Sequence, residues 1–218
     1  MKNTNQENIR KSHFRVTEAS PWVKRFAPLI PKHGPSEGEV LDLAAGNGRN
    51  GRYINTLGYS VTVLDRDVSS LDGITKLKNV RVIQADLETN DHYSNIFADE
   101  PEGNGVLSGK TFAGVVVINY LHRPILKNLI HILEPGGVLI YETFARGNED
   151  FVRPRNPDHL LKSGELLELA KDQLQVVSYE HGRMIDSEIE GVKQRLCAIK
   201  DLAMSAREDG EPTPHLVP

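Results

Sequence analysis

Three glycines with the spacing of a nucleotide-binding loop stand in the first quarter of the chain. They are Gly46, Gly48 and Gly51, in the stretch VLDLAAGNGRNG. A G-x-G-x-x-G lets the backbone turn tightly after a strand and directs the N–H groups of the following helix toward a ligand. The stretch therefore predicts a loop that binds a cofactor containing adenosine, either a nicotinamide dinucleotide or S-adenosylmethionine.

Three acidic residues bear on which cofactor fits. Asp42 lies inside the strand before the glycines, where its carboxylate would repel the pyrophosphate of a dinucleotide. The same carboxylate suits the ammonium group of S-adenosylmethionine, which carries no phosphate. Asp65 is placed to bind a ribose with either cofactor, and Asp86 can accept from an adenine amine, which dinucleotide sites do not require. The alternative for Asp65 and Asp86 is a capping role at strand ends, because Asp favours turns.

Alternating strands and helices are expected to position these residues. Short apolar stretches predict strands at 39–44, 60–65, 80–86, 112–119, 138–143, 175–180 and 193–202. Helical spacing of apolar residues predicts helices at 21–30, 50–58, 124–133 and 164–174. The remaining long segments, 89–110 and 144–163, are expected to be loops. This alternation predicts an α/β fold with a doubly wound, mostly parallel sheet, whose ligands bind at the carboxyl ends of the strands.

Length and composition narrow the class of protein. The chain has 218 residues, 39% of them hydrophobic, with a net charge of -4. We expect a mobile segment at 1–18, one domain at 19–202 and a disordered tail at 203–218. No apolar run approaches the roughly 20 residues that span a bilayer, and the polar N-terminus lacks a signal-peptide core. A single cysteine, Cys197, fits a reducing cytoplasm.

Five successive stretches resemble motifs of the class I S-adenosylmethionine-dependent methyltransferases. In chain order they are VLDLAAGNGRN, VTVLD, VIQADLE, VVVINYLHR and LEPGGVLIYET. Ala44 stands where that family commonly has glycine. The resemblance implies a Rossmann-like methyltransferase fold of seven strands, in which the last strand is antiparallel and inserted beside the sixth. A narrower resemblance is to the tellurite-resistance-type methyltransferases, which act on small or soft nucleophiles. It rests on the pattern GNGRN followed by a Tyr and then by GY.

The resemblance also implies roles for particular residues. Asp42, Ala44, Gly46 and Gly48 would contact the methionine end of S-adenosylmethionine. The nucleoside end would lie against the residues that follow the second and third strands, namely Asp65 at the ribose, Arg66 beside the adenine, and Asp86 and Leu87 at the adenine. Asn119 and Tyr120 would line the side where the methyl group is transferred. The stretch NYLHR departs from the Asn/Asp-Pro-Pro-Tyr motif of enzymes that methylate amines in nucleic acids.

Candidate catalytic and substrate residues follow the fourth and fifth strands. Polarisation of the acceptor is assigned to Tyr120, His122 and Tyr141, which can donate or accept a proton near a strand end. Contacts with the substrate are assigned to four charged residues, Arg123, Glu142, Arg146 and Arg153. An arginine in the 144–163 segment could clamp an acidic group. The alternative is that the charges of this segment form solvated ion pairs that contribute little.

The sequence therefore predicts a methyltransferase that uses S-adenosylmethionine and acts on a small molecule. No cluster of ligands indicates a metal, and neither a membrane nor a nucleic acid is favoured as a partner. One alternative is an NAD(P)-dependent reductase. Asp42 argues against it, and so does the lack of a Tyr-x-x-x-Lys pair at Tyr120, because the residue four positions later is Pro124. The other is a non-catalytic cofactor-binding module. The methyl acceptor and the oligomeric state stay open.

Overall fold

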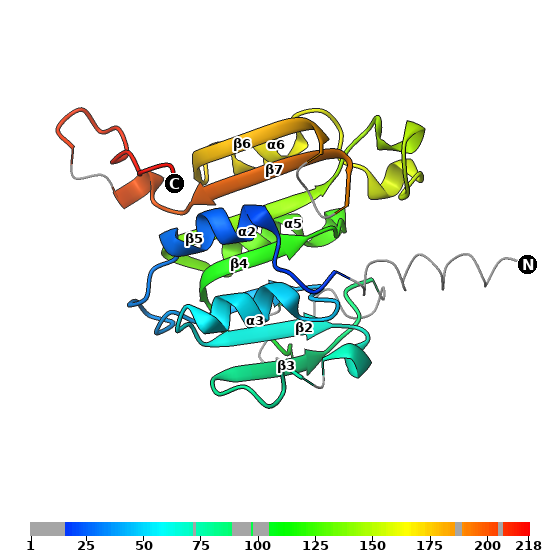
Figure 1. Ribbon diagram of the computed structural model, residues 1–218. Coiled ribbons are helices and arrows are strands. Elements are labelled where there is room, and N and C mark those ends of the chain that lie inside the picture. The colour runs from blue at the N-terminus through cyan, green and yellow to red at the C-terminus, as the bar shows by residue number, and fades with distance from the viewer. Residues whose placement is uncertain (1–15, 72, 89–96, 98–104, 186–188, 205–206) are drawn as a thin grey trace, which may run out of the picture.

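A seven-stranded sheet forms the centre of the molecule. In the computed structural model, residues 16–71, 73–88, 97, 105–185, 189–204 and 207–218 are described. The strand order across the sheet is β3-β2-β1-β4-β5-β7-β6 (Figure 1). The strands are β1 (Val40–Leu43), β2 (Val61–Asp65), β3 (Val80–Gln84), β4 (Phe112–Ile118), β5 (Leu133–Phe144), β6 (Gln175–Met184) and β7 (Gly191–Ile199).

The pairing of the strands confirms the predicted topology. Strands β1 to β5 are joined by parallel ladders. Strand β7 lies between β5 and β6 and is antiparallel to both. The fold is therefore the mostly parallel, doubly wound sheet with an antiparallel last strand that the sequence predicted.

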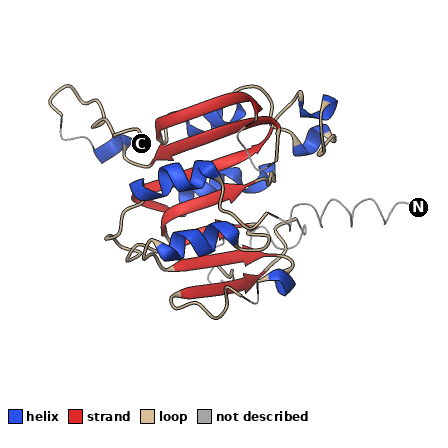
Figure 2. Cartoon of the chain, in the orientation of Figure 1, coloured by secondary structure: helices blue, strands red, loops and turns tan. Residues whose placement is uncertain are grey.

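Helices cover both faces of the sheet (Figure 2). The α-helices are α2 (Pro21–Phe26), α3 (Arg49–Thr56), α5 (Leu126–His131) and α6 (Glu165–Ala170). Short 3-10 turns are η1 (Ala27–Leu29), η2 (Val68–Ser70), η3 (Arg123–Ile125), η4 (Asn148–Asp150), η5 (Pro157–His159) and η6 (Leu202–Met204). Helices α2 and α3 lie on one face, and α5 and α6 lie on the other (Figure 1).

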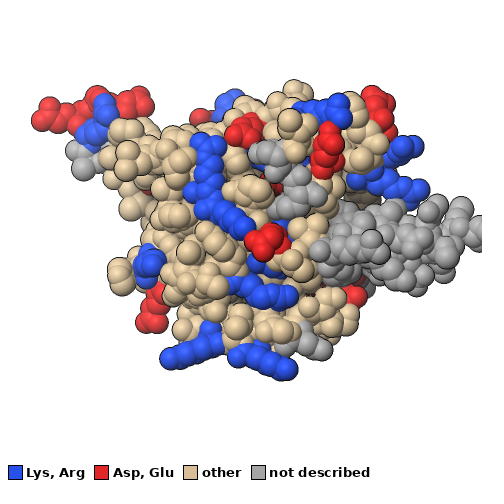
Figure 3. Space-filling model, in the orientation of Figure 1, with Lys and Arg blue, Asp and Glu red and all other residues tan. Residues whose placement is uncertain are grey.

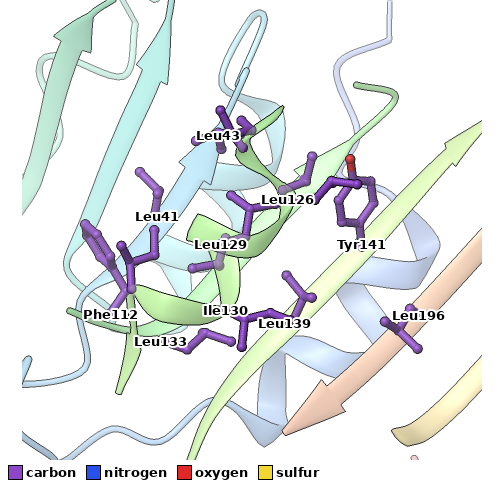
Figure 4. Packing of buried hydrophobic residues seen from close by; sticks show 14 of the residues in the cluster. Leu41, Leu43, Phe112, Leu126, Leu129, Ile130, Leu133, Leu139, Tyr141 and Leu196 are labelled. Carbon is purple, nitrogen blue, oxygen red and sulfur yellow. The ribbon is translucent and has the colours of Figure 1, made fainter. Parts of the chain in front are cut away.

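Each face of the sheet has its own apolar core, because successive residues of a strand point to opposite faces. In β1, Leu41 and Leu43 pack with Leu129 of α5 (Figure 4). Val40 belongs instead to the core that contains Trp22 of α2 and Ile54 of α3. Asp42 has the same parity as Val40, so its carboxylate points toward the α2 and α3 face.

Several predicted boundaries differ from the structure, and two of them have a clear cause. Strand β5 begins at Leu133 rather than at 138, because Leu133 already pairs with Phe112 and the ladder continues after an irregularity. Helix α6 ends at Ala170 rather than at 174, because Lys171 leaves the helical conformation. The predicted start of the first helix is confirmed, since the side chain of Ser20 accepts from the N–H of Trp22 and Pro21 stands in the first turn.

The structure describes only part of the predicted N-terminal segment, 1–18, and most of the predicted C-terminal tail, 203–218. Residues 1–15 and most of the predicted 89–110 loop lie outside the described residues. Near the other end, the carbonyl oxygen of Pro218 accepts from Nε of Arg25 at 2.7 Å, and His215 lies 2.5 Å from Asp201. Among the described residues, no helix is both long enough and apolar enough to cross a membrane.

Candidate active site

Strained backbone gathers at the carboxyl ends of β1 and β4. Four residues there have positive φ, namely Ala44 at 53°, Gly46 at 60°, Gly48 at 71° and Asn119 at 58°. A left-handed conformation in Ala44 and Asn119 costs free energy that only the surrounding structure can offset, and such residues cluster at functional sites. The two strands are neighbours at the point where the strand order reverses direction along the chain, which is where α/β sheets bind ligands.

The three glycines of the motif differ in how closely other atoms pack against them. A Cβ atom on Gly46 would meet no atom within 4 Å, whereas one on Gly48 would lie 2.8 Å from Leu71 and one on Gly51 2.7 Å from Val63. Gly48 and Gly51 therefore allow the loop and α3 to pack closely on the protein. Gly46 alone leaves open space above the loop, as close approach of a ligand requires.

Asp42 is a buried carboxylate that caps helix α3 from below. Only 1% of the residue is exposed, and its Oδ2 accepts from the N–H of Gly51 at 2.8 Å. Burial raises the pKa of Asp42 to about 7, against the opposing effects of the Gly51 hydrogen bond and the charge of Arg49. The carboxylate therefore lies beneath the glycine loop.

The acids at the ends of β2 and β3 also engage the backbone. Asp65 accepts from the N–H of Gly46 at 2.8 Å with one oxygen and from the N–H of Asp67 at 2.9 Å with the other. Asp86 accepts from the N–H of Glu88 at 2.9 Å. A carboxylate has about four acceptor positions, so these bonds leave capacity for a ligand's hydroxyl or amine. Near them, the carbonyl of Arg66 accepts from Gln84 at 3.1 Å, and Leu87 is buried.

A small cavity opens directly above the glycine loop. Its volume is about 140 Å³, and Ala44, Gly46 and Asn119 stand on its wall. The other residues that line it are Val16, Ala45, Asn47, Arg49, Asn50, Ile118 and Ile189. The structure therefore brings together three of the predicted cofactor residues, while those of β2 and β3 follow the neighbouring strand ends.

A larger cavity adjoins the first, with Asn119 on the wall of both. Its volume is about 580 Å³. The remaining lining residues are Glu88, Tyr120, Leu121, Thr143, Phe144, Arg153, Pro154, Arg155, Asn156 and His159. The cavity lies between the ends of β4 and β5 and the segment that follows β5, so a molecule in it would adjoin a ligand on the glycine loop.

A buried ionic network supports Asn119 from the far side of β5. Glu142 accepts from Nζ of Lys193 at 2.6 Å, from Nε of Arg195 at 3.1 Å and from Oγ of Ser20 at 3.1 Å. Nζ of Lys193 also donates to Oδ1 of Asn119 at 3.1 Å. Glu142 and Lys193 are fully buried. The network therefore fixes the orientation of the Asn119 amide between the two cavities.

Lys193 and Arg195 are residues that the sequence reasoning missed. They stand two positions apart in a largely buried strand, which puts both on one face of β7. The pairing of β5 with β7 sets Arg195 directly opposite Glu142. The sequence signal that could have revealed them is a pair of cations in a strand that is apolar enough to be buried. Because buried charges need partners, such a pair indicates an acidic residue on a neighbouring strand.

The three catalytic candidates have different surroundings. Tyr120 stands on the wall of the larger cavity. The hydroxyl of Tyr141 donates to the carbonyl of Tyr120 at 2.9 Å, and its ring packs against the α5 face (Figure 4). Burial raises the pKa of Tyr141. Burial also lowers the pKa of His122, which the charges of Glu88 and Asp86 partly oppose. The structure therefore brings only Tyr120 of the three to a cavity wall.

Of the four predicted substrate residues, only Arg153 lines the larger cavity. Arg146 pairs with Glu149 at 2.8 Å, and Glu142 belongs to the buried network. Arg123 forms two hydrogen bonds with Glu165, at 2.7 and 2.9 Å. Its guanidinium thus ties the end of β4 to α6. Among the residues that the structure describes, no three His, Cys, Asp or Glu side chains form a group that could hold a metal ion.

The fold of the sheet and its helices is shared with solved methyltransferases that bind S-adenosylhomocysteine. A family model described as tellurite resistance protein TehB matches residues 5–193, and the chain belongs to this family. No curated protein sequence matches it.

Solved structures share the fold at low sequence identity. TehB from Haemophilus influenzae is 21% identical with a TM-score of 0.56, over 75% of this chain and 57% of that protein. This chain therefore matches little more than half of that protein's length. A 1,6-didemethyltoxoflavin-N1-methyltransferase from Burkholderia thailandensis is 17% identical with a TM-score of 0.54, over 83% of this chain and 79% of that one. That enzyme was solved with its acceptor and S-adenosylhomocysteine bound.

A third structure is the glycopeptide N-methyltransferase MtfA, solved with S-adenosylhomocysteine. It is 20% identical with a TM-score of 0.51, over 82% of this chain and 88% of that chain. At these identities the likeness establishes the fold, and the choice of ligand rests on the residues of this chain.

Proposed function

We propose that this protein is an S-adenosylmethionine-dependent methyltransferase that acts on a small-molecule acceptor. The observation that carries the proposal is the pair of adjoining cavities. One lies above the open side of Gly46, the other lies beyond Asn119, and Asn119 stands on both walls. Methyl transfer between two small molecules needs two sites in direct contact, because the nucleophile attacks the methyl carbon in line.

The glycine loop fits S-adenosylmethionine better than a dinucleotide. A dinucleotide places its pyrophosphate on free N–H groups in the first turn of the helix. Here the N–H of Arg49 donates to Oδ1 of Asn47 at 3.3 Å. The N–H of Gly51 donates to Oδ2 of Asp42 at 2.8 Å. Two donors of the first turn of α3 are thus engaged within the protein. The arrangement supports a cofactor without phosphate.

The residues of this chain would hold the cofactor along the strand ends. Gly46 and Ala44 support the methionine end, and Gly48 and Asp42 support the loop beneath it. Asp65 accepts from the ribose hydroxyls. Asp86, with Leu87 and Arg66 nearby, holds the adenine. Bound there, the cofactor supplies an electrophilic methyl group on a sulfonium, so the protein needs no covalent nucleophile.

The walls of the larger cavity would orient the acceptor and exclude water. Leu121 and Phe144 are buried and give it an apolar floor. Removal of water strengthens the polar contacts within such a site. Tyr120 is the candidate best placed to polarise the acceptor, since it lies on the wall beside Asn119. If the nucleophile carries a proton, His159 and Glu88 on the same wall are further groups that can accept it.

Calorimetric titration of the full chain tests the cofactor. We expect S-adenosylhomocysteine and S-adenosylmethionine to bind, and NAD and NADP to give no heat of binding. The S-adenosyl ligands should also raise the melting temperature, because a ligand that binds only the native state stabilises it against thermal unfolding. Binding of NAD without either S-adenosyl ligand would refute the proposal and favour a reductase.

A further inference from the structure

The larger cavity has a strongly cationic side. The segment after β5 contributes Arg153, Arg155 and His159 to its wall, whereas Glu88 is its one acidic lining residue. Glu88 follows β3, and the arginines follow β5, so the charges come from different elements. Lys and Arg side chains also gather where this segment forms the edge of the molecule at the right of Figure 3. The wall near the arginines therefore favours a negative group.

Arg153 and Arg155 differ from neighbouring arginines in their contacts with the described part of the chain. Among the described residues, none forms an ion pair or hydrogen bond with the guanidinium of Arg153 or Arg155. By contrast, Arg146 pairs with Glu149, Arg123 with Glu165 and Arg183 with Glu190. An unpaired guanidinium on a cavity wall offers five N–H donors in a planar fork that matches a carboxylate or a phosphate.

The backbone that carries these arginines is anchored. Asn148 is fully buried, and its Nδ2 donates to the carbonyl of Val152 at 3.1 Å and to that of Pro154 at 2.9 Å. Its Oδ1 accepts from the N–H of Val192 at 3.2 Å. Asn148 thus ties the residues on either side of Arg153 to the start of β7. A recognition group held on a supported backbone loses less entropy when it binds.

Part of the cavity lining is apolar. Phe144 is 2% exposed and Leu121 is 7% exposed, so both present packed side chains to the cavity. A ligand that fills about 580 Å³ is of the size that small-molecule sites hold. It would meet both the apolar side chains of Leu121 and Phe144 and the two arginines.

We infer that the acceptor of this enzyme is a small organic acid, whose oxyanion group is bound by Arg153 and Arg155 while its apolar body lies on Leu121 and Phe144. The inference rests on the proposed function for the identity of the adjoining cofactor site. A carboxylate and a phosphate share the chemistry that these arginines recognise. Placed this way, the acid directs the rest of the molecule toward Asn119 and the methyl group.

The test compares three ring compounds of similar shape in the presence of S-adenosylhomocysteine. Benzoate carries a carboxylate, phenyl phosphate carries a phosphate, and benzamide is neutral. Affinities are measured by titration followed by NMR, for the native protein and for the double variant R153Q/R155Q. The control is Arg81→Gln, which removes one positive charge from an exposed position on β3, away from the cavity.

At least one anion should bind the native protein about tenfold or more tightly than benzamide, as expected of charge-assisted hydrogen bonds. The double variant should lose this preference, and Arg81→Gln should keep it. Whichever anion binds better identifies the acid as a carboxylate or a phosphate.

Equal affinity for all three compounds, binding of none, or a preference that survives in the double variant would overturn the inference. Titration of S-adenosylhomocysteine alone keeps the two proposals apart. If it binds and the preference is absent, only the acceptor class is wrong. If it does not bind, the proposed function itself has failed.

Discussion

At the scale of single residues, Asp42 has an unusual place in the site. An ionised carboxylate is costly to bury, and Asp42 has one protein hydrogen bond described for it, from the N–H of Gly51. That bond and the nearby charge of Arg49 offset part of the cost, yet the pKa still rises to about 7 because of burial. Asp42 thus connects the cofactor loop to the stability of the native state.

The pH dependence of stability follows from the sign of this shift. The unfolded chain has its Asp42 pKa near 3.8, and the folded chain has it near 7. Between these values the folded state holds a proton that the unfolded state has lost, so stability falls as pH rises. The loss is complete above the folded pKa and amounts to about 4 kcal/mol at most.

Asp42→Asn should remove this dependence. The amide keeps an oxygen that can accept from Gly51 and carries no charge. We expect the free energy of unfolding of the variant to increase relative to that of the native protein as pH rises from about 4 to about 7. Urea titrations at several pH values measure the difference. A constant difference across this range would show that folding does not raise the pKa of Asp42.

The sequence predicted some of these residues and missed others for a physical reason. Gly46, Asn119 and Arg153 reach cavity walls because a strand end and a loop point outward whatever lies around them. Glu142 also ends in the right region, but its partners Lys193 and Arg195 lie on β7. No local pattern reveals that β7 lies beside β5, so the sequence could not predict the buried partners of Glu142.

At the scale of elements, the loop between β1 and α3 combines packing with an open site. Gly48 and Gly51 press against Leu71 and Val63, whereas Gly46 faces a cavity. A substitution by alanine therefore separates the two roles within one loop. The comparison needs a control for backbone strain, since Gly46 has a φ of +60°.

Three alanine variants distinguish these roles. Gly51→Ala should destabilise the protein by about 1–3 kcal/mol through overpacking. Gly46→Ala should lose about 1–2 kcal/mol through its left-handed backbone and bind S-adenosylhomocysteine at least about tenfold more weakly. Gly109→Ala is the matched control, because Gly109 has a φ of +64° and a Cβ added to it would meet no atom within 4 Å. Calorimetry supplies both quantities, and equal affinity in the Gly46 and Gly109 variants would remove Gly46 from the site.

The elements themselves were largely predictable, because seven short apolar strands alternate with turns that end them. The fine boundaries were not. The stretch EPGG carries glycines that usually mark a turn, but Leu133 pairs with Phe112 and starts β5 early. Glu134 is buried there and accepts from the N–H of Ser36 at 2.8 Å. A contact nearly a hundred residues away in the chain thus overrides the local signal.

At the scale of the whole molecule, the segment after β5 is held from several directions. Residue Ala145 forms a bridge with Leu161, and the side chain of Gln194 donates to the carbonyl of Lys162 at 2.6 Å. Arg123 adds a third attachment, from the end of β4. The segment that supplies part of the wall of the larger cavity is therefore held by contacts with β7, α6 and the turn after β4.

Arg123 makes the attachment through most of its donors. Beyond its two bonds with Glu165, it donates to the carbonyl of Asp158 at 2.7 Å and to that of Leu160 at 2.8 Å. Glu165 also accepts from the N–H of Lys162 at 2.7 Å. The pair lies partly open to solvent, so its contribution to global stability is modest. Its main effect is expected on the local opening of residues 156–162.

Arg123→Gln should show this separation of local from global stability. Amides in 156–162 should exchange with solvent about tenfold faster or more, because the glutamine cannot bridge the carbonyls and Glu165 at once. The affinity for S-adenosylhomocysteine should stay unchanged, since its proposed site lies at the ends of β1, β2 and β3. The control is Lys24→Gln, which breaks an exposed pair with Glu18 and should leave exchange in 156–162 as it is. Hydrogen exchange read by mass spectrometry measures both, and unaltered exchange in the Arg123 variant would mean that Asn148 and Gln194 hold the segment without it.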